Sequence, residues 1–401
     1  MSADGRSADA DARAGLESAS FVRLVARADG DALAASGLVA QALTDRGTPF
    51  QITVGRTIAD RTARAEVAAG DERDLTLVIG AADIDADADA TATVTRLDAD
   101  DRPATLAAVD HVRELGSTPD LVLALAGLAA AGLEPGAGES EWVLETAQER
   151  GLVERRPGLA VPTADPADGV AYSTRLCGPW SGDADALADA VDLDRPAQLE
   201  TDDHRAIASL VALEAVSADA AEDVAAASIQ RAIRPYETPD GPFETIGGYA
   251  DVLEATARTE PGTSGALAMG HDVREPALSA WREYGRRAHR ALEGASTGRY
   301  DGLFVVGIGD GPVEGVAQIA AAYRSPEPTV LAIGDGEAAL ATRSDESLGP
   351  AVEGVARDLA CETAYDVGRR RGYLRYDADP NGDANADVDE STIIATVREL
   401  L

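Results

Sequence analysis

The sequence contains no lysine, so arginine carries its basic charge. Only two cysteines and four histidines occur among 401 residues, and Cys177 and Cys361 lie far apart. This scarcity excludes a disulfide framework and argues against a metal site built on cysteine or histidine. The N-terminal stretch is acidic and polar, and no apolar run approaches the length of a membrane span. We therefore expect a cytoplasmic protein without a membrane partner.

Acidic residues outnumber basic ones by two to one. Asp and Glu total 71 against 35 arginines, which gives a formal net charge of −36. The excess is spread along the whole chain, as is typical of a halophile whose cytoplasm holds molar salt. At that salt concentration the Debye length is about 3 Å, so surface repulsion is mostly screened. The global charge therefore says little about partners, and local arginine clusters are more informative.

Apolar runs and amphipathic stretches alternate through the first 150 residues. The apolar runs predict strands at residues 21–26, 49–54, 75–79 and 91–97. The amphipathic stretches predict helices at residues 33–44, 104–115 and 140–149. Residues 120–131 are almost wholly apolar, so periodicity leaves helix and strand open there. This alternation is typical of a parallel, doubly wound α/β sheet.

The rest of the chain has a less regular pattern. Residues 159–183 are predicted to be a loop, residues 202–232 a helix or helix pair, and residues 264–270 a strand. Further on, strands are expected at residues 302–307 and 329–333, and helices at residues 275–293, 313–323 and 391–400. Glycine-rich turns stand at residues 307–311 and 334–336, and residues 377–390 are predicted to form an acidic loop.

Two aspartates follow the first predicted strand, where the next helix begins. The stretch reads LVARADGDALAASGLVA from Leu24 to Ala40, with Asp29 and Asp31 in the turn. In parallel α/β sheets, ligands bind at the carboxyl ends of the strands, and two carboxylates there could hold a hard divalent cation. Local chemistry also allows a plainer interpretation, because Asp-Gly is a common turn pair and Asp is a good helix N-cap.

This segment resembles motif I of the DHH phosphoesterase superfamily, and especially of archaeal RecJ-like nucleases. That motif runs His-x-Asp-Ala-Asp-Gly, followed after two residues by Ala-Ala-Gly and an apolar helix. Aligned on Gly37, both aspartates are kept as Asp29 and Asp31, Arg27 takes the position of the His, and Ala32 that of the Gly. The resemblance extends from about residue 21 to residue 375 and rests on motif order more than on identical residues.

The resemblance implies a fold and a division into domains. We expect an α/β protein in which a parallel, doubly wound DHH domain is joined by a helical linker to a smaller α/β domain of the DHHA1 type. The expected bounds are a disordered acidic tail at 1–18, the DHH-like domain at 19–192, the linker at 193–235 and the DHHA1-like domain at 236–401.

In this family, two Mn²⁺ or Mg²⁺ ions clamp the oxygens of an in-line phosphodiester attack. Aligned on Pro103, the family's Asp-His-His falls on residues 99–101, where neither His remains. The apolar run at 123–133 ends without the Asp of the fourth ligand position. The resemblance therefore leaves no catalytic residue to name and only vestigial or weak metal ligands. These are Asp29, Asp31, Asp98, Asp100 and Asp101.

An arginine run stands out against the acidic background. Arg369, Arg370 and Arg371, with Arg375 close by, fall where the DHHA1 domain of the family meets the nucleic-acid backbone. Arg258 matches the terminal Arg of the family's Asn-Ala-Cys-Gly-Arg motif. Guanidinium forks bind phosphate in bidentate fashion, so all five arginines are candidate nucleic-acid contacts. The plainer interpretation of the run is a solvated helix end or a set of ion-pair partners.

Three functional hypotheses follow. The missing ligands favour a catalytically degenerate RecJ-like protein of DNA replication and repair, which binds single-stranded nucleic acid or serves as a replisome scaffold with GINS and MCM proteins. The alternative is an active, Mn²⁺- or Mg²⁺-dependent exonuclease on single-stranded DNA or RNA. The third hypothesis is an unrelated α/β protein whose glycine-rich turns hold a phosphate group.

Overall fold

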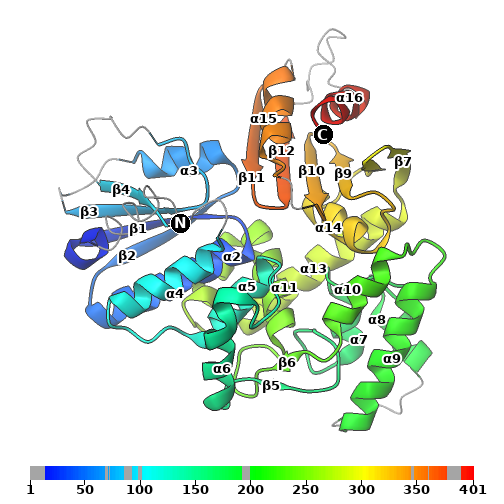
Figure 1. The fold of residues 1–401 in the computed structure, drawn as a ribbon, viewed down its shortest axis with the longest axis horizontal. Coiled ribbons are helices and arrows are strands. Elements are labelled where there is room, and N and C mark those ends of the chain that lie inside the picture. Colours follow the sequence, from blue (N-terminus) through cyan, green and yellow to red (C-terminus); the bar gives the residue numbers. More distant parts are fainter. Residues whose placement is uncertain are drawn as a thin grey trace. The chain divides into compact units, whose positions relative to one another are not determined.

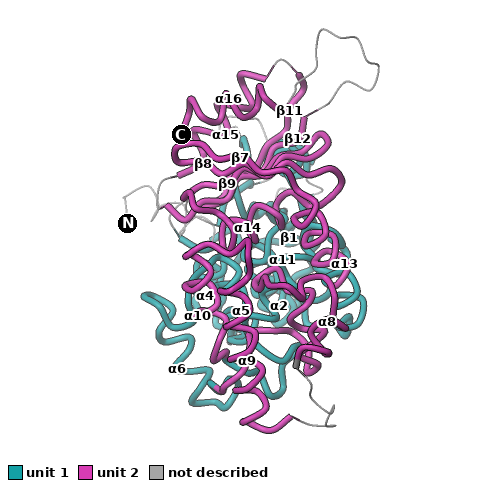
Figure 2. The backbone as a smooth tube through the Cα atoms, turned by 90° about the vertical axis from the view of Figure 1, so that its right-hand side faces the viewer, with its two compact units in different colours: residues 1–155, 236–281 teal, residues 156–235, 282–401 magenta. Residues whose placement is uncertain are grey.

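The computed structural model describes residues 14–67, 71, 73–84, 93–97, 102–191, 199–344, 347–359, 361–376 and 390–401. The chain folds into two compact units, drawn in different colours in Figure 2. Unit 1 comprises residues 1–155 and 236–281, and unit 2 comprises residues 156–235 and 282–401. The domain bounds expected from the sequence stay a prediction. Residues 14–18 are helical and Leu16 is buried.

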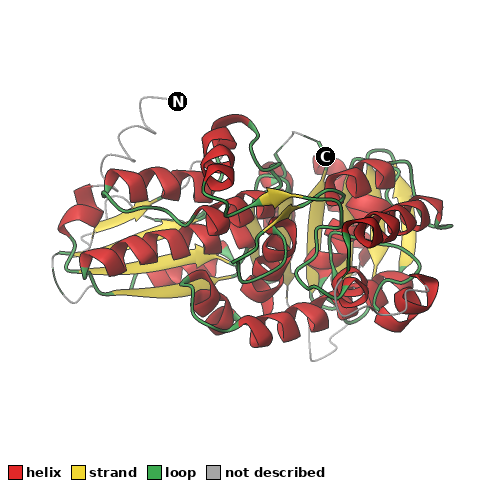
Figure 3. Ribbon diagram, turned by 90° about the horizontal axis from the view of Figure 1, so that it is seen from below, coloured by secondary structure: helices red, strands yellow, loops and turns green. Residues whose placement is uncertain are grey.

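Unit 1 is built on a four-stranded parallel sheet in the order β2-β1-β3-β4 (Figure 1). Its strands are β1 (Phe21–Arg27), β2 (Phe50–Gly55), β3 (Asp74–Ile79) and β4 (Thr93–Arg96). The four strands predicted from the sequence are thus confirmed within the described residues. The central strands β1 and β3 are the most buried because helices cover both faces of the sheet. Helix α3 lies on one face and α2 with α4 on the other (Figure 1), and Figure 3 shows helices on both sides of the strands.

The helices of unit 1 begin where the sequence supplies a cap. Helix α5 follows Asp120, whose carboxylate accepts from the N–H groups of Val122 and Leu123, so the apolar run is a helix and not a strand. Residues 236–281 return to this unit, where α11 packs against α2 and α5. The helices are α2 (Gly30–Arg46), α3 (Ile58–Ala65), α4 (Ala104–Glu114), α5 (Leu121–Ala130), α6 (Glu141–Glu149), α11 (Ile246–Thr259) and α12 (Pro261–Ala268).

The strand predicted at residues 264–270 is wrong, because most of this stretch lies in α12. Pro261 stands in the first turn of α12, where a proline is well tolerated. The small residues that follow allow a close approach to α2: a side chain at Gly37 would collide with the backbone of Ala268. This packing between helices decides the conformation, and the sequence pattern of the stretch alone does not reveal it.

Unit 2 is built on a six-stranded sheet in the order β11-β12-β10-β9-β8-β7. Only β8 and β9 run parallel, joined by the crossover helix α14 (Val313–Tyr323), and the other pairs are antiparallel. Helix α14 packs against β9 and β10, and α15 (Gly349–Asp358) packs against β11 and β12. The strands are β7 (Ser296–Tyr300), β8 (Leu303–Gly307), β9 (Thr329–Gly334), β10 (Glu337–Thr342), β11 (Thr363–Val367) and β12 (Arg371–Tyr376).

The helical part of unit 2 corrects one prediction and confirms another. The predicted loop at 159–183 contains α7 (Pro166–Tyr172), which Asp165 caps by accepting from the N–H of Ala167. The helical pattern at 202–232 is confirmed as α9 (Thr201–Ser217) and α10 (Val224–Ala232). The remaining helices are α8 (Ala184–Val191), α13 (Arg274–Glu293), which runs from unit 1 into unit 2, and α16 (Glu390–Leu400).

The expected α/β class, with a parallel sheet followed by a second sheet-rich part, is confirmed. The predicted acidic loop at 377–390 lies outside the described residues except for its last residue. Among the described residues, no helix is both long and apolar enough to cross a membrane.

Candidate ligand edge of the parallel sheet

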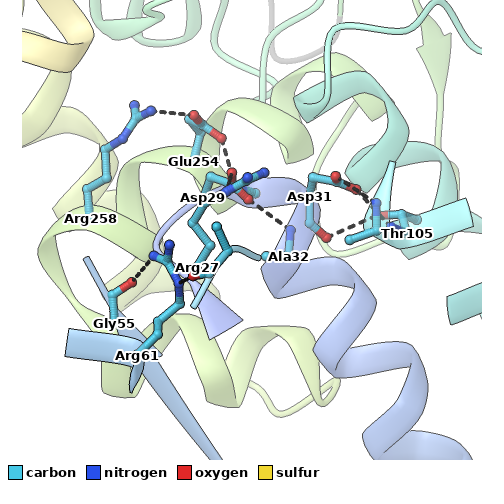
Figure 4. Close-up of polar contacts among 12 residues, drawn as sticks. Arg27, Asp29, Asp31, Ala32, Gly55, Arg61, Thr105, Glu254 and Arg258 are labelled. Carbon is cyan, nitrogen blue, oxygen red and sulfur yellow. Dashed lines mark hydrogen bonds and ion pairs between the residues drawn. The ribbon is translucent and has the colours of Figure 1, made fainter. Parts of the chain in front are cut away.

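Asp29 caps the helix that follows β1. Its backbone is extended (φ −142°, ψ 168°), and its Oδ1 atom accepts from the N–H of Ala32 at 2.9 Å (Figure 4). Its Oδ2 atom accepts from Nε of Arg27, the last residue of β1. Both oxygens of the Asp29 carboxylate therefore have a donor, one from the N-terminus of α2 and one from a guanidinium group.

Asp31 caps a different helix. Its Oδ2 and Oδ1 atoms accept from the N–H groups of Ala104 and Thr105, each at 2.9 Å, at the start of α4. The Thr105 hydroxyl donates to the backbone oxygen of Asp31 at 3.0 Å. Helix α4 has Pro103 at its own N-cap position, which supplies no side-chain acceptor. The carboxylate of Asp31 thus caps the N-terminus of α4, a role that an Asp or Ser directly before the helix commonly has.

Burial shapes the ionisation of this pair. Asp31 is 6% exposed, and desolvation together with the negative charge of Asp29 raises its pKa from 3.8 to about 6. The hydrogen bonds from Thr105 and the charge of Arg27 act in the opposite direction, because they favour the ionised carboxylate. The two aspartates are therefore electrostatically coupled as well as close in sequence.

A third carboxylate, that of Glu254, reaches the same helix end from α11. Its Oε2 atom accepts from the N–H of Gly30 at 2.8 Å, and its Oε1 atom accepts from Arg258 at 2.6 Å. The side chains of Glu254 and Arg258 are each only 3% exposed. The structure thus places Arg258, a candidate nucleic-acid contact, in a buried ion pair, and its proposed contact with nucleic acid stays a prediction.

Arg61 of α3 ties two strand ends together. Its Nε donates to the backbone oxygen of Ala81, just beyond β3, at 2.7 Å. Its Nη1 donates to that of Gly55, the last residue of β2, at 3.1 Å. The residue is fully buried. The motif and its spacing do not point to Arg61, Thr105 or Glu254. A Glu four residues before Arg258 has the spacing of an ion pair on a helix, and this signal could have found the pair.

The carboxylates of Asp29 and Asp31 already serve the protein's own donors. All four oxygens accept from N–H groups, one of them from the guanidinium group of Arg27, so a divalent cation here would compete with an ion pair and two helix caps. Within the part of the chain that the structure describes, no three His, Cys, Asp or Glu side chains are grouped to hold a metal ion. Asp98, Asp100 and Asp101, the other predicted ligands, lie outside the described residues.

The predicted arginine run forms a hairpin turn in unit 2, not a helix end. Arg369 and Arg370 are exposed at the tip between β11 and β12. The turn is closed by the Gly368 N–H, which donates to the Arg371 oxygen at 2.8 Å. The Thr342 N–H donates to the Arg370 oxygen at 3.0 Å and fixes the turn to the end of β10. Arg375 is exposed on β12.

The glycine-rich turns of unit 2 follow the ends of β8 and β9, but their charge is negative. Asp310 of the first turn forms an ion pair with Arg287 at 2.8 Å. Burial and the nearby charges of Glu390 and Asp335 raise the pKa of Tyr376, which donates to the oxygen of Gly334, to about 12. An acidic neighbourhood of this kind opposes phosphate binding, so the structure gives no support to the third hypothesis.

Comparison with solved structures places the fold. The crystal structure of CDC45 from Entamoeba histolytica aligns with a TM-score of 0.59 at 8% identity and covers 99% of each chain. A structure of exonuclease RecJ bound to manganese aligns with a TM-score of 0.47 at 13% identity, covering 98% of this chain and 92% of RecJ. The protein is therefore of the class that has the two-part α/β fold of CDC45.

Sequence comparison gives the family. The chain is 44% identical over 352 residues to the uncharacterized protein rrnAC1427 of Haloarcula marismortui, an alignment that covers 84% of this chain and 86% of that protein. Residues 295–399 match the family model of the C-terminal domain of rrnAC1427. The chain thus belongs to the rrnAC1427 family.

Proposed function

We propose that this chain is a non-catalytic protein of the RecJ and CDC45 type, which binds single-stranded nucleic acid or acts as a replisome scaffold. The observation that carries the proposal is the engagement of all four carboxylate oxygens of Asp29 and Asp31 by N–H donors. These are the two aspartates that the resemblance to RecJ-like nucleases preserves. In this chain they cap α2 and α4.

Energetics support this proposal over the exonuclease. A phosphodiesterase of this type needs metal ions that activate a water molecule and stabilise both oxygens of the displacement. Coordination by Asp29 and Asp31 would compete with the two caps, each worth about 1 kcal/mol, and with the ion pair between Asp29 and the guanidinium of Arg27.

The hairpin turn of unit 2 is the proposed contact with nucleic acid. Arg369 and Arg370 are exposed, and the bond from Thr342 holds the turn in place. Guanidinium groups on such a turn suit phosphate oxygens, and they would bind a strand without cutting it. Arg371 and Arg375 extend the proposed contact along β12. GINS and MCM proteins remain the proposed protein partners.

Fluorescence anisotropy with labelled single-stranded DNA and RNA tests this function. The measurement uses a series of KCl concentrations that begins at the lowest one at which circular dichroism shows the full chain folded. Arg369→Gln/Arg370→Gln is compared with Arg290→Gln/Arg357→Gln, which removes two other exposed arginines of unit 2. Each single-strand phosphate contact contributes about 0.7 to the slope of log K against log salt. We expect the first variant to lose about 1.4 of this slope and the control to lose none.

The same samples, incubated with Mn²⁺ and resolved on a gel, separate the two functions. Binding without cleavage supports the proposal. Mn²⁺-dependent shortening of the labelled strand would instead favour the exonuclease, and equal binding by both double variants would remove the hairpin turn as the contact.

A further inference from the structure

We infer that the guanidinium groups of Arg27 and Arg61 act as built-in cations at the edge of the parallel sheet where its strands have their C-terminal ends. They join the ends of β1, β2 and β3 and close this edge to divalent ions. This inference extends the proposed function. Its interpretation as the exclusion of ligands rests on that function being non-catalytic. It concerns the edge at which a parallel α/β sheet ordinarily binds its ligand.

Arg27 supplies the charge that faces Asp29. It is the last residue of β1, and its Nε donates to Oδ2 of Asp29, with each side chain 16% exposed. Asp29 is thereby paired with a cation that is covalently part of the strand. The second oxygen of Asp29 accepts from the N-terminus of α2, so an ion at this carboxylate would compete with both a guanidinium group and a helix N–H.

Arg61 spans the end of β1. Two of its acceptors, the backbone oxygens of Gly55 and Ala81, belong to the ends of β2 and β3, which are the neighbours of β1 in the sheet. Strands two places apart are separated by about 9–10 Å, so the side chain must cross the end of the strand between them. A Cβ atom at Gly80 would lie 2.9 Å from Cβ of Arg27 and 3.5 Å from Nε of Arg61. The two arginines therefore lie together at this edge, as Figure 4 shows.

The charges at this edge of the sheet oppose the binding of further ions. A divalent ion beside Asp29 would lie close to two fixed guanidinium groups in a largely desolvated place, where repulsion between like charges is strong. Anions are excluded for the complementary reason: Asp29 and Glu254 already occupy N–H donors at the start of α2, where an anion would bind. The edge is neutralised by the protein's own side chains.

A double-mutant cycle on the full chain tests this inference. Arg27→Gln, Asp29→Asn and the double variant are unfolded by heat in molar KCl, with EDTA or with Mn²⁺, and followed by circular dichroism. The exposed ion pair of Arg205 and Asp202, 2.7 Å apart on α9, provides the control cycle with the same substitutions. Should Arg27→Gln not fold, Arg27→Lys replaces it, since lysine keeps the charge and lacks the Nε donor.

The inference predicts coupling at Arg27 and Asp29 alone. Each single substitution should lower Tm by several degrees, and the double variant should lie no lower than the less stable single variant. The control cycle should be additive with small shifts. An ion that binds only the folded state raises Tm. Since the inference has no Mn²⁺ bound at Asp29, adding Mn²⁺ should change the Tm of the wild type and of Asp29→Asn by the same amount. Additive effects at Arg27 and Asp29, or a Mn²⁺ response of the wild type that Asp29→Asn loses, would overturn the inference.

The proposed function and this inference can fail separately. Mn²⁺-dependent cleavage by the wild type, together with coupling in the cycle and equal Mn²⁺ responses of the wild type and Asp29→Asn, would contradict the non-catalytic function and support the guanidinium edge. Additive effects of the Arg27 and Asp29 substitutions, without cleavage by the wild type, would support the non-catalytic function and contradict the guanidinium edge.

Discussion

Glu254 accepts a hydrogen bond from the backbone N–H of Gly30 at 2.8 Å, although the two residues stand 224 positions apart in the chain. The bond joins α11 to the first residue of α2. It places part of the later sequence, residues 236–281, in the same compact unit as the parallel sheet. The N-terminal unit is therefore complete only when the chain returns to it after residue 235.

Replacing Glu254 by Ala should destabilise the protein strongly. The substitution leaves Arg258 buried without its carboxylate and removes the acceptor for the Gly30 N–H, so we expect a loss of about 3–5 kcal/mol in the free energy of unfolding. Glu254→Gln keeps an acceptor and should lose less. Urea unfolding measures both, with the exposed Glu145→Ala as the control. A loss for Glu254→Ala no larger than that of the control would contradict the packing of α11 against α2.

The pKa of Asp31 predicts a pH dependence of stability. Because its folded pKa of about 6 lies above the 3.8 of an unperturbed carboxyl, protonation favours the folded state. The contribution of Asp31 is therefore largest below pH 4 and is lost as the pH rises through 6, by on the order of 2–3 kcal/mol. Asp31→Asn removes this titration. The difference in unfolding free energy, wild type minus variant, should fall between pH 4 and pH 7.

Asp45→Asn, an exposed substitution on the same helix, controls for the general effect of removing one negative charge. A difference for Asp31→Asn that is constant with pH would show that the carboxyl titrates like an exposed one.

Arg61→Met tests the hydrogen bonds by which Arg61 joins the ends of β2 and β3. Methionine fills much of the volume but removes the donor of the buried Gly55 oxygen, at a cost of about 1–3 kcal/mol, and the donor of the half-buried Ala81 oxygen, at a smaller cost. Arg64 lies on the same helix, and among the described residues it donates to the oxygen of Asp60 alone, so Arg64→Met should cost less than about 1 kcal/mol. Similar losses in chemical denaturation for the two variants would count against these hydrogen bonds.

Arg234 has a φ of 57°, and it is the one non-glycine residue with a positive φ in the described part of the chain. Glycine adopts this left-handed conformation without a Cβ clash, whereas alanine keeps the clash. Arg234→Gly and Arg234→Ala both remove the side-chain contacts, so their difference isolates the backbone. The glycine variant should be more stable by about 1 kcal/mol in urea unfolding. An alanine variant of equal stability would mean that the backbone relaxes at this position.

The strands of unit 1, strands β8 and β9, and about half of the helices could be predicted because their signals are local. Alternating apolar runs give β1 to β3, and a polar cap followed by an apolar helix gives α2. The stretch at 264–270 was misjudged because its small residues form a helix through contact with α2, a partner distant in sequence. Strands β10 and β12 were missed for a related reason: each is defined by pairing across the sheet of unit 2.

The site was partly predictable. The motif pointed to Asp29 and Asp31, and the general preference of Asp for N-caps already offered their capping role as an alternative. The partner of Asp31 could not be foreseen, because Ala104 and Thr105 are 73 and 74 residues away and contribute backbone N–H groups. The same holds for Arg61, whose acceptors are backbone oxygens at the ends of two strands. Hydrogen-bond partners that contribute only backbone groups cannot be recognised from the residue types in a sequence.

The most direct test of the account is a Mn²⁺ titration of the full chain in molar KCl, followed by the electron paramagnetic resonance signal of free Mn²⁺. The wild type is compared with Asp29→Asn/Asp31→Asn. If these aspartates serve as helix caps, both proteins will leave the same amount of Mn²⁺ free at every concentration. A stoichiometric Mn²⁺ site in the wild type that the double variant loses would show that the aspartates are metal ligands and would contradict the non-catalytic function.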